Sequence, residues 1–200
     1  MRVAIFVFPE LTELDAIGVF DPLARVSAMG IDGNCTVKLV GTEEVVTGHF
    51  GASLQVGAVF PRLDRFDLLV IPGGFGTRAL QKEIKVIEYL RSWGSVKPVA
   101  TVCTGALLAA AAGFLRGKRA TTHRAAFEEL AAYGVEVADE RIVEDGRVIS
   151  AGGVTSALDL GLYLVEKHWG ADARRRIAAQ MEYTDNGPRP APAPSQDPAN

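Results

Sequence analysis

Residues 99–106 read VATVCTGA and place a cysteine, Cys103, between a buried strand and a helix. Apolar strand-forming residues run from Pro98 to Val102, and a small apolar helical stretch follows from Thr104 to Ala112. A cysteine at such a junction has the geometry of a nucleophile elbow, in which a strained turn between small residues lifts the reactive atom above the sheet. The stretch therefore predicts an α/β fold with a reactive sulfur at the carboxyl end of a strand.

Strands and helices alternate on both sides of this junction. Apolar strand patterns cover residues 3–8, 36–40 and 66–71, and helical spacing covers residues 14–26, 84–93, 123–133 and 157–168. This alternation predicts right-handed crossovers and a mostly parallel sheet covered on both faces. Asp145-Gly146 separates two short strands, residues 141–144 and 148–151, and indicates a hairpin. Ligands of such sheets gather at the carboxyl ends of the strands.

Composition limits the domain count and the partners. A chain of 200 residues that is 48% hydrophobic supports one core, so we expect a single domain over residues 1–186 and a Pro-rich mobile tail over residues 187–200. Acidic residues outnumber basic ones 24 to 21, which argues against a nucleic-acid partner. Two widely spaced cysteines indicate a reducing, cytoplasmic location. Because apolar runs stay shorter than the roughly 20 residues of a membrane span, no membrane association is expected.

Two features of the sequence could create a reactive centre. The helix that begins after Cys103 would point its N–H groups at the sulfur and lower the thiol pKa; alternatively, Cys103 is an inert buried residue. Gly73 and Gly74 follow another strand at its carboxyl end. Their main-chain N–H groups, with that of Thr104, could stabilise negative charge on a substrate, or the two glycines simply make a turn.

An acid and a histidine are candidate partners of the cysteine. Asp15 follows the first strand closely enough to reach the same sheet edge, where a desolvated carboxyl would serve acid/base chemistry; a solvated or capping role is the alternative. His123 could form a Cys-His pair or be a helix-start residue satisfied by backbone. His49 and His168 lack clustered ligands, so we expect no metal site.

Four motifs in order resemble the ThiJ/PfpI superfamily, which is related to class I glutamine amidotransferases. They are VIPGG at 70–74, VCTGA at 102–106, ATTH at 120–123 and AGGVTS at 151–156, and together they extend over nearly the whole chain. Within the superfamily, Asp15, Cys103-Thr104-Gly105, the glycine pair 152–153 and Met181-Glu182-Tyr183 are similar to the isonitrile (isocyanide) hydratase members.

The resemblance implies a homodimeric, flavodoxin-like three-layer α/β/α sandwich without a cofactor. Cys103 would attack the terminal carbon of an organic isocyanide, and water would release an N-substituted formamide. Asp15 would carry protons, and the hydroxyl and backbone of Thr104 would flank the sulfur. Gly73 and Gly74 would form a backbone pocket beside it, and His123 and Gly153 would contribute to substrate binding.

This chain departs from other branches of the superfamily. Peptidase-type and many deglycase-like relatives have histidine directly after the cysteine and glutamate at the early acidic position, where this chain has Thr104 and Asp15. Sensory domains of AraC-like regulators share two of the motifs, but no basic helix-turn-helix pattern is found here. A glyoxalase or deglycase acting on reactive aldehydes, and a cysteine-based redox or stress-response protein without turnover, remain as alternatives.

Overall fold

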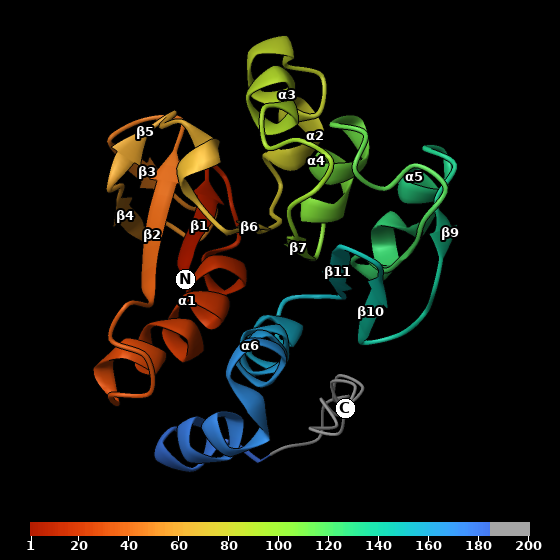
Figure 1. The fold of residues 1–200 in the computed structure, drawn as a ribbon. Coiled ribbons are helices and arrows are strands. Elements are labelled where there is room, and N and C mark those ends of the chain that lie inside the picture. Colours follow the sequence, from red (N-terminus) through yellow and green to blue (C-terminus); the bar gives the residue numbers. More distant parts are fainter. Residues whose placement is uncertain (185–200) are drawn as a thin grey trace, which may run out of the picture.

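The computed structural model describes residues 1–184, and a seven-stranded sheet forms their centre (Figure 1). The strands lie in the order β10-β11-β7-β6-β1-β2-β5. All neighbours pair in parallel except β10 and β11. The strand bounds are β1 Arg2–Val7, β2 Thr36–Gly41, β5 Ala58–Val59, β6 Leu68–Ile71, β7 Val99–Val102, β10 Ile142–Asp145 and β11 Val148–Ala151. The predicted mostly parallel sheet is confirmed.

Helices cover both faces of the sheet and complete a flavodoxin-like three-layer α/β/α sandwich. Figure 1 shows the first and last helices side by side on one face, and the remaining helices together on the other. The first group is α1 Glu13–Ala28 and α6 Ser156–Gln180. The second group is α2 Thr77–Leu80, α3 Ile84–Arg91, α4 Gly105–Ala111 and α5 Phe127–Ala131. The predicted fold class is therefore correct.

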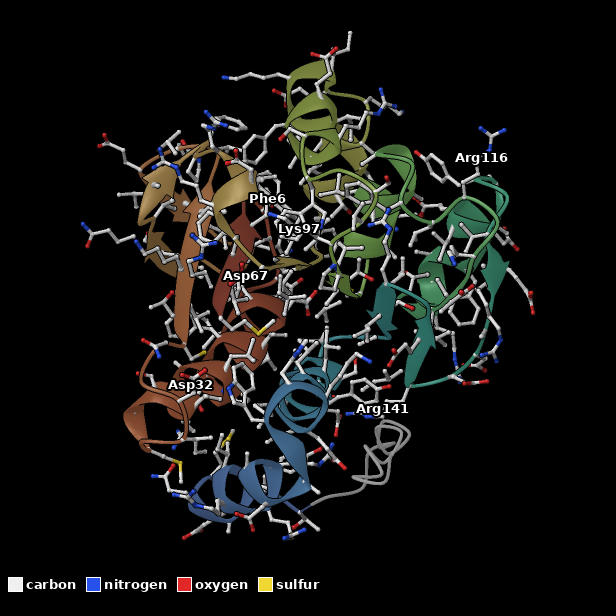
Figure 2. All side chains as sticks on the ribbon, viewed as in Figure 1. Phe6, Asp32, Asp67, Lys97, Arg116 and Arg141 are labelled. Atoms are coloured by element: carbon white, nitrogen blue, oxygen red, sulfur yellow. The ribbon has the colours of Figure 1, made fainter. Side chains whose placement is uncertain are left out.

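The central strands are apolar on both sides because both sides are covered. Every residue of β6 and β7 is buried, and β1 is buried from Val3 to Val7. Figure 2 shows Phe6 inside the molecule, whereas Arg116 projects from its surface. Continuous apolar strands of this kind are typical of parallel sheets between two helical layers.

Helices α1 and α6 pack against each other unusually closely. A Cβ at Gly18 of α1 would lie 2.8 Å from the Cβ of Ala157 in α6. In the same way, a Cβ at Gly161 of α6 would lie 2.8 Å from Cγ of Pro22 in α1. Two glycines therefore set the spacing of these helices, and α1 carries Asp15 in its first turn.

The hairpin prediction is also confirmed, since β10 and β11 are antiparallel around Gly146, whose φ is 62°. Two further small sheets pair β3 Val45–Thr47 with β4 Ser53–Gln55, and β8 Arg119–Ala120 with β9 Glu136–Val137. The predicted tail, residues 187–200, lies outside the described residues, as does the domain boundary at 186. Within residues 1–184, no helix is both long and apolar enough to cross a membrane.

Two helix predictions need correction. The stretch 123–133 begins as a 3-10 turn, Arg124–Ala126, and becomes α-helical only over α5. The last helix runs to Gln180 instead of stopping at His168; its backbone kinks at Gly170, where φ is 88°. A glycine directly after an apolar helical run looks like a stop signal in sequence, although here the chain continues in a second helical piece.

Candidate active site

Cys103 lies between β7 and α4 with a left-handed backbone, φ 53°, which is rare for a residue with a side chain. The neighbouring chain holds this conformation through main-chain bonds. The Cys103 N–H donates to the carbonyls of Ala151 and Gly152 at 3.0 and 2.9 Å. Its carbonyl accepts from the buried hydroxyl of Thr122 at 2.7 Å. The strained turn expected from the sequence is present, and β11 and Thr122 support it.

Gly105 makes this turn possible through close approach to the next strand. A Cβ at this position would lie 2.0 Å from the carbonyl oxygen of Ile71 and 2.7 Å from that of Pro72. No side chain fits in that space, so the glycine lets α4 begin against the end of β6. The elbow and the Pro72-Gly73-Gly74 segment are consequently in direct contact.

Asp15 is fully buried and lies beside the cysteine. Its Oδ2 accepts from the N–H of Gly73 at 3.0 Å, and its carboxyl is close enough to the Cys103 thiol for the two groups to shift each other's pKa. Within residues 1–184, its Oδ1 has no partner that meets hydrogen-bond geometry. Asp15 is thus neither solvated nor a helix cap, and the structure brings the predicted acid and cysteine together.

Burial raises the pKa of both groups, and their interaction acts in opposite directions on the two. Burial raises the pKa of the Asp15 carboxyl to about 7, against the bonds from Gly73 and Cys103, which lower it. Burial raises the pKa of the Cys103 thiol to about 12, and the nearby Asp15 carboxylate adds to this rise. The backbone and side chain of Thr104, next to the sulfur, act in the opposite direction. The expected low pKa of the thiol is therefore wrong, since burial and the adjacent acid outweigh the helix N-terminus.

These pKa values make Asp15 a candidate proton acceptor for the Cys103 thiol. Near neutral pH the cysteine is a thiol, and the carboxyl of Asp15 is close to the midpoint of its titration. A carboxylate placed against an S–H can accept that proton when the sulfur attacks and can deliver it afterwards. The pair is thus suited to proton transfer coupled to attack.

Gly73 and Gly74 hold the acid and Thr104 in place. The Gly73 N–H binds Asp15, and the Gly74 N–H donates to the Thr104 hydroxyl oxygen at 2.9 Å. The same hydroxyl donates to the Gly74 carbonyl at 3.0 Å. Both glycine N–H groups are therefore occupied by side chains, and the predicted pocket for negative charge on a substrate is not formed by them. A Cβ at Gly73 would lie 2.6 Å from the Thr104 nitrogen, so only glycine fits there.

His123 lies at the cavity but takes the backbone role left open by the sequence. Its Nδ1 accepts from the Ala125 N–H at 3.2 Å and caps the following 3-10 turn. Its ring also packs on Gly153, where a Cβ would lie 2.9 Å from the His123 Cδ2. Gly153 thus makes room for the His123 ring. No hydrogen bond within residues 1–184 joins His123 to Cys103, and the acid that shifts the pKa of Cys103 is Asp15.

A cavity of about 340 Å³ opens onto Cys103. Thr104, Gly74 and His123 line it near the sulfur, and Phe50, Phe75, Ala125 and Val154 provide apolar walls. Phe75 stacks on His49 at 4.0 Å between ring centroids, and both phenylalanines are largely exposed to solvent. Phe50, Phe75 and Thr122 give no signal in the sequence, because each acts through a contact between distant segments.

Residues 1–184 contain no cluster of three or more His, Cys, Asp or Glu side chains that could hold a metal ion. A parallel sheet covered on both faces, with an acid buried beside a cysteine on a strand-to-helix turn, defines the class of α/β proteins with a cysteine elbow. The DJ-1/PfpI family profile matches residues 1–167, and the chain belongs to that family.

Several proteins are similar to this chain over most of its length. It is 33% identical over 199 residues to the isonitrile hydratase of Pseudomonas putida, which covers 98% of this chain and 82% of that protein. It is 34% identical over 148 residues to deglycase PfpI of Pyrococcus furiosus, covering 72% of this chain and 87% of that protein. A ThiJ/PfpI family protein from Pseudomonas syringae superposes with a TM-score of 0.83 at 28% identity, over 94% of this chain and 76% of the other.

Proposed function

We propose that this protein is an isonitrile hydratase, in which the Cys103 thiol adds to an organic isocyanide and water releases an N-substituted formamide. The observation that carries the proposal is the fully buried Asp15 carboxyl against the Cys103 thiol, with a pKa near 7. The similarity to the Pseudomonas putida hydratase over 98% of the chain supports the same choice.

The reaction needs one proton to move from sulfur to carbon. Asp15 accepts the proton as the S–H bond breaks and sulfur bonds to the terminal isocyanide carbon. Asp15 then returns the proton to that carbon, which gives a thioimidate. Water adds to the thioimidate carbon, the C–S bond breaks, and the products are the formamide and the free thiol. An acid with a pKa near the working pH is best suited to such a two-way transfer.

The other residues of the site have supporting roles in this proposal. Thr104 flanks the sulfur with its N–H and hydroxyl, while Gly73 and Gly74 fix Asp15 and Thr104. His123, supported by Gly153, forms part of the substrate wall. The apolar walls of the cavity suit a small uncharged substituent on the isocyanide. These steps require no cofactor.

We also infer that the protein works as a cytoplasmic homodimer without a nucleic-acid partner. Phe50 and Phe75 are 77% and 59% exposed at the rim of the cavity, and a second copy would shield such apolar side chains from water. Light scattering across a concentration series tests the dimer, and a mass that stays at one chain would refute it.

Turnover of an aryl isocyanide tests the function directly. Purified protein is mixed with 4-nitrophenyl isocyanide, and the absorbance of the formamide is followed. We expect steady turnover by wild type, a loss of at least about 10³-fold in Cys103→Ala, and a change within about twofold in Cys35→Ala. The absence of turnover by wild type, or full turnover by Cys103→Ala, would refute the proposal.

A deglycase is the second candidate, because the chain is 34% identical to deglycase PfpI over 148 residues. Its thiol would add to an aldehyde carbon in place of an isocyanide carbon. Consumption of methylglyoxal under the same conditions distinguishes the two. Faster methylglyoxal consumption than isocyanide turnover, lost in Cys103→Ala, would favour the deglycase.

A further inference from the structure

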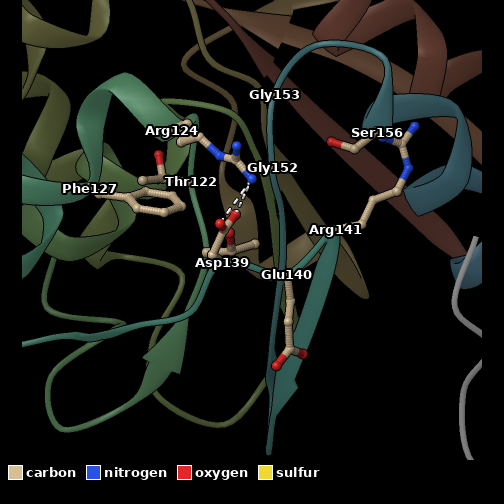
Figure 3. Close-up of a pocket in the computed structure, with 10 residues that line it drawn as sticks. Thr122, Arg124, Phe127, Asp139, Glu140, Arg141, Gly152, Gly153 and Ser156 are labelled. Carbon is tan, nitrogen blue, oxygen red and sulfur yellow. Dashed lines mark hydrogen bonds and ion pairs between the residues drawn. The ribbon is translucent and has the colours of Figure 1, made fainter.

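A second cavity of about 260 Å³ lies beside Gly152 and Gly153, in the segment between β11 and α6 (Figure 3). Its lining includes Thr122, Arg124, Asp139, Gly152 and Ser156, and we call it the Arg124 cavity. Unlike the apolar cavity at Cys103, it is lined mainly by polar and charged groups. Nothing in the proposed reaction uses it.

Ser156 gives the cavity an unsatisfied hydroxyl. The residue is the first of the 25-residue helix α6, and only 1% of its surface is exposed. Its Oγ has no hydrogen-bond partner within residues 1–184. Figure 3 shows the hydroxyl directed into the cavity. A buried hydroxyl without a partner destabilises a fold, and its retention at a cavity wall points to a ligand that completes its bonding.

Arg124 supplies a positive charge opposite this hydroxyl. Its Nη2 donates to both carboxylate oxygens of Asp139 at 2.8 and 2.9 Å. Both of its side-chain hydrogen bonds within residues 1–184 come from Nη2, so Nη1 and Nε remain as donors for an acceptor in the cavity. This side chain is 78% exposed and can adjust to a ligand.

The other charged groups at the cavity are paired elsewhere. Glu140 forms an ion pair with Arg119 and is turned away from the cavity in Figure 3. Arg141 binds the buried Asp159 through its Nε at 2.6 Å. The ion pair between Asp139 and Arg124 neutralises the charge of Arg124 in part. The first turn of α6 adds the positive end of a helix dipole, which favours negative charge.

We propose that the Arg124 cavity binds a small oxyanion group, a carboxylate or a phosphate, between the Ser156 hydroxyl and the Arg124 guanidinium. Such a group accepts a hydrogen bond from the hydroxyl and a charge-assisted one from the guanidinium. Both donors are then satisfied, and the volume admits a molecule the size of acetate or phosphate with its hydration.

An ion bound here would contact the backbone that supports the elbow. Thr122 and Gly152 both line the cavity, and both bond to Cys103, one through its hydroxyl and the other through its carbonyl. We therefore expect occupancy of the Arg124 cavity to change the reactivity of Cys103. The alkylation rate of the Cys103 thiol measures this change, so the test does not depend on the proposed hydratase activity.

Amide chemical shifts measured by NMR test the binding. Wild-type protein is titrated with sodium acetate, with sodium phosphate and with sodium chloride at matched pH and ionic strength. We expect saturable shifts at Gly152, Gly153 and Ser156 with acetate or phosphate, and none with chloride. Saturation by acetate alone assigns a carboxylate, and saturation by phosphate alone assigns a phosphate group. Shifts that never saturate, or that chloride reproduces, would overturn the proposal.

Substitutions test whether the ion binds at Ser156 and Arg124. Ser156→Ala removes a hydroxyl that has no partner, so the fold is retained, and we expect the Kd to rise at least about fivefold. Arg124→Met should weaken binding at least as much. Ser95→Ala, at an exposed loop position, should leave it unchanged. Unchanged affinity in Ser156→Ala would refute the site, and an alkylation rate of Cys103 unaffected by saturating ion would refute its link to the elbow.

Discussion

The two cysteines of this protein are almost equally buried yet lie in different environments. Cys103 is 5% exposed and Cys35 is 4% exposed, and burial raises the pKa of both thiols. Cys35 precedes β2 and turns its sulfur to the carbonyl of Leu23 in α1 at 3.8 Å. Cys103 has a left-handed backbone, lines a cavity and lies beside an acid. Burial and a raised thiol pKa are common to both cysteines, whereas the cavity and the adjacent acid distinguish Cys103 from Cys35.

Among these predictions, removal of the Asp15 carboxylate beside Cys103 should have the largest effect, on the free energy of unfolding. The pKa of Asp15 in the folded protein, about 7, lies above its ordinary value of 3.8, so the folded state favours the protonated carboxyl. Stability from this group is present at low pH and is lost as the pH rises from about 4 through 7. At pH 8 the loss reaches at most about 4 kcal/mol. Asp15→Asn should therefore unfold at higher urea than wild type at pH 8 and at a similar concentration at pH 4.

The same variant sharpens the contrast between the thiols. Without the carboxylate, the pKa of Cys103 should fall, and its alkylation at pH 8 should become faster, while Cys35 keeps its rate. Asp21→Asn, on the exposed side of α1, serves as the matched control and should show no stabilisation at pH 8. Lower stability of Asp15→Asn at pH 8 would contradict a desolvated acid.

A methyl group at the elbow should have the next largest effect. In Gly105→Ala the new Cβ meets the Ile71 carbonyl oxygen at 2.0 Å, so α4 must move away from β6. We expect a loss of about 3 kcal/mol in the free energy of unfolding, measured by urea denaturation. Gly33→Ala is the control, since its Cβ would meet no atom within 4 Å. Equal effects of the two substitutions would show that the elbow is looser than the distances indicate.

Alkylation compares the cysteines in the unmodified protein. Iodoacetamide should label Cys103 at least about tenfold faster than Cys35 near neutral pH, because a cavity reaches one sulfur and helix packing covers the other. Both rates should still be rising at pH 9, since both thiol pKa values are raised. Mass spectrometry of the two peptides over time measures this. Equal rates in the folded protein would remove the distinction.

The smallest effect should come from Thr122, which supports the elbow without facing the acid. Thr122→Val removes the 2.7 Å bond to the Cys103 carbonyl and leaves that oxygen unsatisfied. We expect a loss of about 1 kcal/mol in unfolding free energy and a slower alkylation of Cys103. Thr36→Val, at an exposed strand position, should change neither. An unaltered alkylation rate in Thr122→Val would mean that the backbone conformation of Cys103 does not depend on the Thr122 hydroxyl.

Much of the fold follows from local patterns, because long apolar strands and glycine turns have few alternative structures. Residues 66–71 and 98–102 were predictable as buried strands from their own residues, and the strands form over 68–71 and 99–102; Asp145-Gly146 likewise indicates the observed hairpin. The extension of α6 past Gly170 is not predictable from the sequence, since a kinked helix and a helix end have the same local pattern. The helix predicted over 123–133 becomes α-helical only from Phe127, because His123 caps a 3-10 turn that precedes it.

The site divides in a similar way. Cys103 and Asp15 could be placed at one sheet edge from their positions after two strands, and the structure brings them together. The thiol pKa was predicted in the wrong direction, because the sequence reveals a helix start but not the burial of the sulfur or the depth of the acid. The occupied N–H groups of Gly73 and Gly74 likewise depend on side chains that are 58 and 30 residues away in sequence.

The close contact between α1 and α6 has a consequence for how this protein can evolve. Gly18 and Gly161 fix the distance between two helices on the face of the sheet opposite to α4, and α1 carries Asp15 one turn away from Gly18. A larger residue at either glycine would push α1 outward and draw the carboxyl back from the sulfur. Variation at the contact between these two helices can therefore change the separation of the Asp15 carboxyl and the Cys103 thiol, while the residues that line the cavity stay the same.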